Sequence, residues 1–72
     1  MYSLNNVDGN AHAIIGYVKA CMKEKKCGST EIREYEKQAK MYDYTHLLNV
    51  SQEYIDMLNQ MEQQQEFKVT YI

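Results

Sequence analysis

The sequence predicts a mainly α protein, a three-helix bundle, and leaves open a two-stranded β-ribbon formed by the N- and C-terminal segments. The chain contains no Pro and only 3 Gly, whereas an all-β protein of this size needs many turns and normally shows more of both. Apolar residues recur every three or four positions through most of the chain, which is the spacing of one helix face. Breaks near residues 28–30 and at residue 43 divide this pattern into three helices.

The length of the chain predicts one small domain that spans residues 1–72. A chain this short buries only about 60% of the surface that its unfolded form exposes, so we expect modest stability unless a partner covers part of it. The hydrophobic fraction of 44% and the charged fraction of 25% are typical of a globular protein. No apolar segment approaches the ~20 residues that would span a membrane.

The first helix is predicted over about residues 10–27. Asp8-Gly9 predicts a turn, and Asn10 is a typical N-cap, because its side chain can accept a hydrogen bond from a free N–H of the first turn. Gly28 is expected to end the helix as a left-handed C-cap. The apolar stripe of this helix consists of Ala11, Ile14, Ile15, Val18, Cys21 and Met22.

The second helix is predicted over about residues 30–42. Ser29 can cap its start, and Glu31 in the first turn suits the positive end of the helix dipole. The inner stripe of this helix consists of Ile32, Tyr35, Ala39 and Tyr42.

The third helix is predicted over about residues 44–63, with Asp43 as its N-cap. It is the longest and most regular of the three. Its apolar stripe consists of Tyr44, Leu47, Leu48, Ser51, Tyr54, Ile55, Leu58 and Met61.

The two terminal segments alternate between apolar and polar residues, which is typical of half-buried strands. Residues 2–7 and residues 67–72 both show this pattern. Because a lone strand is unstable in water, the natural arrangement pairs the two segments as a ribbon beside the helices. The alternatives are that residues 67–72 form a disordered tail or a strand that pairs between two chains.

Two segments together resemble a known group of small proteins. Asp8-Gly9-Asn10-Ala11 with the following Ile14-Ile15-Gly16, and later Asp43-Tyr44-Thr45-His46-Leu47-Leu48, resemble segments of small, mostly uncharacterised proteins of phages, plasmids and bacterial genomes. The similarity covers roughly residues 7–56, and Tyr42 stands where that group usually has Gly. The resemblance implies a mobile-element origin and a compact helical domain, and it carries no known activity.

The residues that could support a metal site or catalysis are few. A structural zinc site usually shows close pairs of ligands, whereas Cys21 and Cys27 have five residues between them and His12 and His46 lie far apart in the sequence. We therefore expect no metal and no cofactor. Cys27 with His46 is a conceivable nucleophile pair, but three short helices rarely offer a catalytic pocket, so no enzymatic activity is expected. With two Cys and no visible signal peptide, a cytoplasmic protein with reduced thiols is expected.

The charge of the chain is unevenly distributed although the net charge is only −2. Residues 1–42 hold seven of the eight Lys and Arg residues but only half of the acidic ones. The simplest interpretation of this basic group is a solvated face, and the alternative is a phosphate-binding patch around the turn between helices one and two. Acidic residues at the start of helix two weaken the nucleic-acid hypothesis. The basic group consists of Lys19, Lys23, Lys25, Lys26, Arg33, Lys37 and Lys40.

Apolar residues off the main stripes suggest a partner surface. Tyr17, Met41 and Met57 could form an adaptable apolar patch of the kind that binds other proteins, and the alternative is a small core that wraps around them. The leading hypothesis is a non-enzymatic protein-interaction module, an accessory protein of a phage or mobile element that binds or inhibits a host protein and that self-associates as a homodimer. The runner-up is a small nucleic-acid-binding regulator. The predicted partner-binding residues are Tyr17, Met41, Tyr42, Met57, Lys19, Lys23, Lys26 and Lys37.

Overall fold

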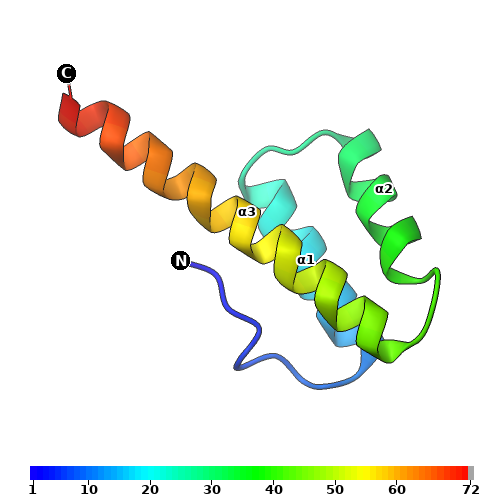
Figure 1. Cartoon of the computed structure of the whole chain (residues 1–72). Helices are drawn as coiled ribbons and strands as arrows, with labels where there is room; N and C mark the ends of the chain where they lie inside the picture. The colour runs from blue at the N-terminus through cyan, green and yellow to red at the C-terminus, as the bar shows by residue number, and fades with distance from the viewer. Residues whose placement is uncertain (72) are drawn as a thin grey trace.

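Three helices pack against one another in the computed structural model, which describes the backbone of residues 1–71 and the side chains of residues 1–61. Helix α1 spans Ala11–Glu24, α2 spans Ser29–Ala39 and α3 spans Tyr44–Tyr71. Helices α1 and α2 both lie along the N-terminal part of α3, and the N-terminal segment runs back beside the helices (Figure 1). The prediction of a mainly α three-helix bundle is confirmed.

The predicted β-ribbon is wrong for the residues that the structure describes. Within residues 2–7, Leu4–Val7 form a turn, in which the Val7 N–H donates to the carbonyl of Leu4 (3.2 Å). Helix α3 was predicted to end near residue 63 but continues to Tyr71 through the segment predicted as a strand, and Ile72 lies outside the described residues. Extending a helix adds one internal hydrogen bond for each residue, whereas a strand needs a partner. A short alternating run cannot distinguish the two.

The first helix ends three residues earlier than predicted, and Gly28 is not its C-cap. Lys26 adopts the left-handed conformation (φ 61°). The N–H of Cys27 donates to the carbonyl of Met22 (2.9 Å), and the N–H of Lys26 donates to that of Lys23 (3.0 Å). This is the Schellman arrangement, which a non-glycine residue fills here at some conformational cost. Gly28, with φ −68°, is instead the N-cap of α2.

Two side-chain caps fix the other helix starts as predicted. Asn10 Oδ1 accepts from the N–H of Ala13 (2.8 Å), and Asp43 Oδ1 accepts from the N–H of His46 (3.0 Å). Because Asp43 caps α3, α2 must end several residues before it. Helix α2 ends at Ala39 rather than at the predicted residue 42. Tyr42 therefore lies in the connection between α2 and α3, outside the inner stripe in which the periodicity had put it.

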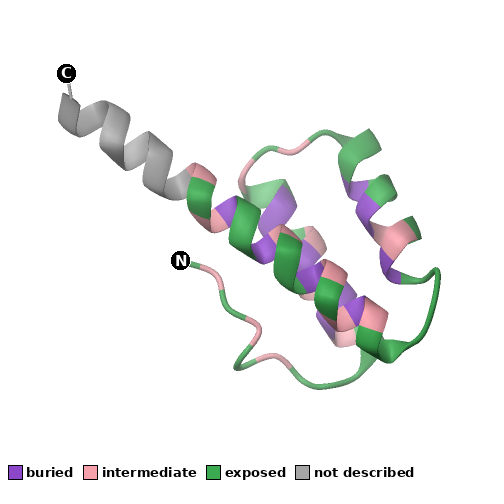
Figure 2. Cartoon of the chain, in the orientation of Figure 1, coloured by how far each residue is buried: buried purple, intermediate pink, exposed green. Residues whose placement is uncertain are grey.

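The core lies where the three apolar stripes meet, and buried residues face inward on all three helices (Figure 2). The ring of Tyr35 is fully buried and packs against the ring of Tyr54, with 4.9 Å between the ring centroids. Ser51 is also fully buried, and its hydroxyl forms a hydrogen bond with that of Tyr35, with 2.7 Å between the oxygens. Ala11 and Tyr44, predicted as core residues, are exposed at the ends of their stripes. The largest fully buried side chains are Tyr35, Met22, Ile55, Leu58, Val18 and Ser51.

Candidate protein-interaction surface

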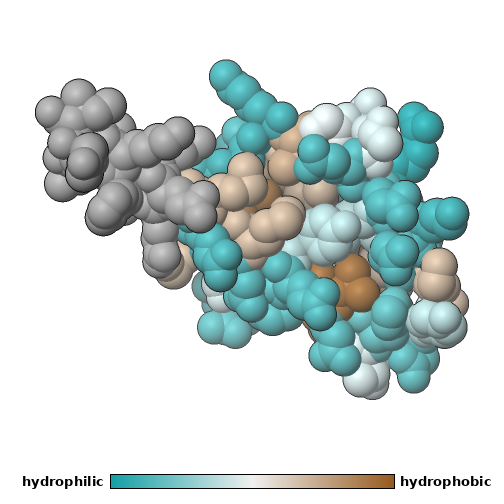
Figure 3. Space-filling view, turned by 45° about the horizontal axis from the view of Figure 1, so that its top comes forward, coloured by the Kyte–Doolittle hydropathy of each residue, from teal (hydrophilic) through white to brown (hydrophobic). Residues whose placement is uncertain are grey.

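The connection between α2 and α3, together with the first residue of α3, exposes three large side chains within four residues. Met41 is 46% exposed, Tyr42 71% and Tyr44 45%. The Tyr42 ring packs edge-on against the His46 ring, with 4.8 Å between the ring centroids. The Tyr44 hydroxyl donates a hydrogen bond to the carbonyl of Gly9. We call Met41, Tyr42 and Tyr44 the apolar corner. In Figure 3, weakly polar and apolar side chains stand among hydrophilic ones at this end of the molecule.

A hollow of about 230 Å³ adjoins the apolar corner. Tyr42 and Tyr44 line it together with the buried side chains of Ile15, Ala39 and Leu47. These residues come from all three helices, so the hollow exists only in the packed bundle. It is large enough to receive one apolar side chain of a partner, and the exposed rings beside it would pack around that side chain.

A basic groove runs between α1 and α2 and meets this hollow. Its two parts, of about 390 and 240 Å³, share Lys19, Lys23 and Glu36. Lys40 lines the larger part and Arg33 the smaller. We call Lys19, Lys23, Arg33 and Lys40 the basic groove. Because Ile15 and Lys40 line both the larger part and the hollow at the apolar corner, the two features form one continuous surface.

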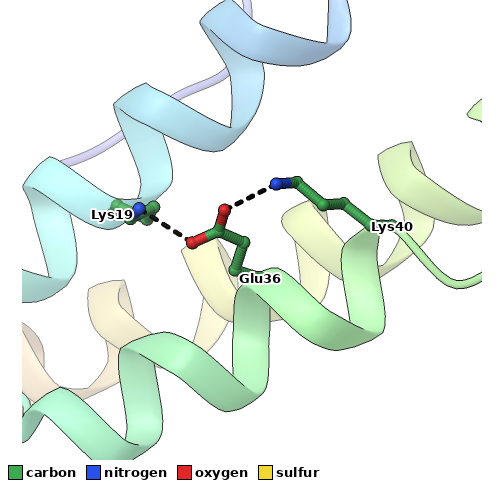
Figure 4. Close-up of polar contacts among 3 residues, drawn as sticks. All are labelled: Lys19, Glu36 and Lys40. Carbon is green, nitrogen blue, oxygen red and sulfur yellow. Dashed lines mark hydrogen bonds and ion pairs between the residues drawn. The ribbon is translucent and has the colours of Figure 1, made fainter.

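Glu36 lies between two of these lysines (Figure 4). Its carboxylate accepts from the ammonium of Lys19 at 2.8 Å and from that of Lys40 at 2.7 Å. The Lys19 contact joins α1 to α2, and the Lys40 contact connects two residues four positions apart in the sequence. The hydrogen bond from Lys19, followed by that from Lys40, lowers the pKa of Glu36 from the ordinary 4.5 to about 2. The carboxylate therefore stays charged, and the groove retains more cations than anions.

The Glu36 ion pairs are expected to make folding stability fall as acid is added. Because the folded-state pKa is depressed, the contribution is complete above about pH 4.5 and is lost as the pH falls toward 2. Glu36→Gln should flatten the pH dependence of the unfolding free energy in this interval, measured by urea denaturation. The matched control is Glu34→Gln, an exposed carboxylate on the same helix. Equal flattening by both variants would contradict this assignment.

The structure brings together some of the predicted partner-binding residues. Met41 and Tyr42 belong to the apolar corner, and Lys19 and Lys23 belong to the basic groove. Tyr44, Lys40 and Arg33 also line this surface and were not among the predicted partner-binding residues. The periodicity put Tyr44 in the apolar stripe of the third helix, but its position directly after the Asp43 cap was a signal that it lies at the exposed end of that stripe.

The other predicted partner-binding residues lie elsewhere. Tyr17 is half-buried against the core, and its hydroxyl accepts from the N–H of Ser3 (3.1 Å), so it does not form a patch with Met41. Met57 is 39% exposed but lies about 20 Å beyond Tyr44 along α3. Lys26 lies in the turn after α1, and Lys37 is exposed on α2.

The candidate nucleophile pair has no support in the geometry. Cys27 and His46 lie at opposite ends of α2. His46 Nε2 is 3.0 Å from the carbonyl oxygen of Gln38, so its ring packs at the helix junction. Cys21 and Cys27 are free thiols, and burial raises the pKa of both, which favours the less reactive protonated form.

Among the described residues, no group of three or more His, Cys, Asp or Glu side chains could hold a metal ion. In the same part of the chain, no helix combines the length and the apolar character needed to cross a membrane. No protein-family model matches the chain, and neither do curated proteins or solved structures.

Proposed function

We propose that this chain is a non-enzymatic protein-interaction module that binds an acidic protein partner through the apolar corner and the basic groove. The observation that supports the proposal is the continuity of the two features through Ile15 and Lys40. A partner segment with an apolar anchor and neighbouring carboxylates would fit both at once. The anchor would fill the hollow beside Tyr42, and the carboxylates would meet the lysines of the groove.

The residue types at the apolar corner are those that carry binding energy in protein interfaces. Tyr and Met are enriched in interfaces, and a few such residues account for most of the affinity. Tyr42 is 71% exposed, so burial against a partner would remove much apolar surface from water. The groove would contribute mainly specificity and association rate, because exposed charges gain little net affinity.

The proposal is tested with Met41→Ala/Tyr42→Ala against Met57→Ala, a matched exposed methionine outside the corner. Each is used to capture proteins from nuclease-treated lysate of the native host, and the captured partner is then titrated by calorimetry. We expect the double variant to lose affinity at least about 30-fold, the effect of one strong interface residue. Met57→Ala should bind normally, and added salt should mainly slow association. A partner that binds the double variant as tightly as the unchanged chain would contradict the proposal.

Nucleic-acid binding is the second candidate, and the basic groove is the observation that favours it. Contacts with phosphates would make binding fall steeply with salt, with a log–log slope set by the number of phosphates engaged. Against it, Glu36 occupies the groove, and Glu31 and Glu34 are exposed on α2. Loss of capture after nuclease treatment, with a steep salt slope reduced by Lys23→Ala, would favour this candidate.

An accessory role in a phage or other mobile element, with inhibition of a host protein as a special case, rests on the resemblance of residues 7–56. Self-association as a homodimer stays a prediction, which sizing of the purified chain by light scattering would test.

A further inference from the structure

Side chains of α1 and α3 hold the main chain of the N-terminal arm, which we define as residues 1–9. The N–H of Tyr2 donates to Asn59 Oδ1 (2.8 Å), and Asn59 Nδ2 donates back to the carbonyl of Tyr2 (3.0 Å). The N–H of Ser3 donates to the hydroxyl of Tyr17 (3.1 Å). These hydrogen bonds resemble those that a neighbouring strand would supply, and they come here from side chains that line a seam between α1 and α3.

Two side chains of the arm fit the same seam. Tyr2 and Leu4 are half-buried and pack against the core. The Tyr2 hydroxyl donates to Glu24 Oε1 (2.8 Å), and the ammonium of Lys25 lies 5.9 Å from the centre of the Tyr2 ring. The seam therefore holds a tyrosine followed, two residues later, by an aliphatic side chain.

The arm lies outside the three helices and contacts them through the side chains of Tyr2 and Leu4 and through its main chain. Beyond Leu4 the side chains of Asn5, Asn6 and Asp8 are exposed. The Val7-to-Leu4 turn and the contact of Gly9 with Tyr44 hold this stretch. A segment that lies outside the helices and whose anchoring side chains are only half-buried opens at a smaller free-energy cost than the whole bundle. The seam can then be vacated while the bundle stays folded.

We propose that the seam bounded by Tyr17, Glu24 and Asn59 is a second binding site, for a peptide of a partner protein with a tyrosine-x-aliphatic sequence. The arm occupies this site in cis and competes with the partner peptide. Competition follows because the apparent dissociation constant equals the intrinsic one divided by the fraction of molecules with the arm released. This inference concerns a different surface from the apolar corner and does not depend on the proposed function.

The test uses a fluorescein-labelled peptide with the sequence of residues 1–7, titrated with the full-length chain by fluorescence anisotropy. The full-length variant Tyr2→Ala/Leu4→Ala weakens the chain's own arm, so it should bind the peptide at least about 10-fold more tightly than the unchanged chain. Adding Asn59→Ala to this variant should reverse the gain. Asn49→Ala, an exposed asparagine on the same helix, is the matched control and should not. A peptide with Tyr and Leu made adjacent should bind weakly.

The proposal would be overturned if the unchanged chain and the Tyr2→Ala/Leu4→Ala variant bound the peptide with equal affinity. It would also be overturned if that variant kept its thermal unfolding transition but did not bind the peptide. If the arm variant does not fold, hydrogen exchange on the unchanged chain decides. Excess peptide should then speed exchange at the Tyr2 and Ser3 amides, and unchanged protection at saturating peptide would overturn the proposal. Dimers that form only when Tyr2 and Leu4 are present would identify a second copy as the occupant and would also overturn it.

Discussion

Tyr35→Ala is expected to remove a large part of the folding stability. The ring of Tyr35 is completely buried and contacts the ring of Tyr54. Truncation of a buried aromatic residue to Ala costs about 3–5 kcal/mol, because apolar burial is lost and a cavity remains. A domain of this length has a total stability of roughly 4–11 kcal/mol, so this single change removes a large fraction of it. The measurement is the urea midpoint followed by far-ultraviolet circular dichroism.

The matched control for Tyr35→Ala is Tyr42→Ala. The chemical change is identical, but the Tyr42 side chain is 71% exposed. Its removal should change the unfolding free energy by no more than about 0.5 kcal/mol. If the two variants lost similar stability, the assignment of Tyr35 to the core and of Tyr42 to the surface would be wrong.

Ser51→Ala is expected to cost about 1–3 kcal/mol, although the side chain loses one oxygen atom. The Ser51 hydroxyl is the hydrogen-bond partner of the buried Tyr35 hydroxyl. Its removal leaves a phenol without that partner in the core. The better helix propensity of Ala offsets this by only a few tenths of a kcal/mol. Tyr35→Phe should cost less, because the Ser51 hydroxyl can turn to a carbonyl of its own helix.

A double-mutant cycle separates the hydrogen bond from packing. In the Ser51→Ala background, Tyr35→Phe removes the stranded hydroxyl and should restore part of the lost stability, with a coupling energy of about 0.5–3 kcal/mol. Additive effects of the two substitutions would show that the pair is not coupled. The measurement is the unfolding free energy of all four proteins from urea titrations.

The features that could be predicted from the sequence depend on neighbours along the chain. The caps at Asn10 and Asp43 formed as predicted, because the donors that they bind lie three residues ahead. The buried faces of the helices followed the spacing of apolar residues, with errors at the ends of the stripes. Four of the seven residues of the candidate surface, Met41 and Tyr42 with Lys19 and Lys23, were among the predicted partner-binding residues.

The wrong predictions concern segments in which two local backbone conformations have similar energy. The left-handed position after α1 fell on Lys26 rather than on Gly28, because the cap position depends on where the helix stops. The C-terminal segment had a strand-like alternation but continues α3. The C-terminal segment would form a strand only if a second strand paired with it. The N-terminal segment, its predicted partner, forms its hydrogen bonds with side chains of α1 and α3 instead.

The sequence by itself determined three amphipathic helices, their two side-chain caps and most of the core, because hydrogen bonding and periodicity act over three or four residues. The tertiary structure decided the rest. It brought Asn59 to the main chain of Tyr2, 57 positions away, and put Glu36 of α2 beside Lys19 of α1. It also joined the apolar corner to the basic groove. Such contacts depend on how the helices pack, which no spacing within one helix encodes.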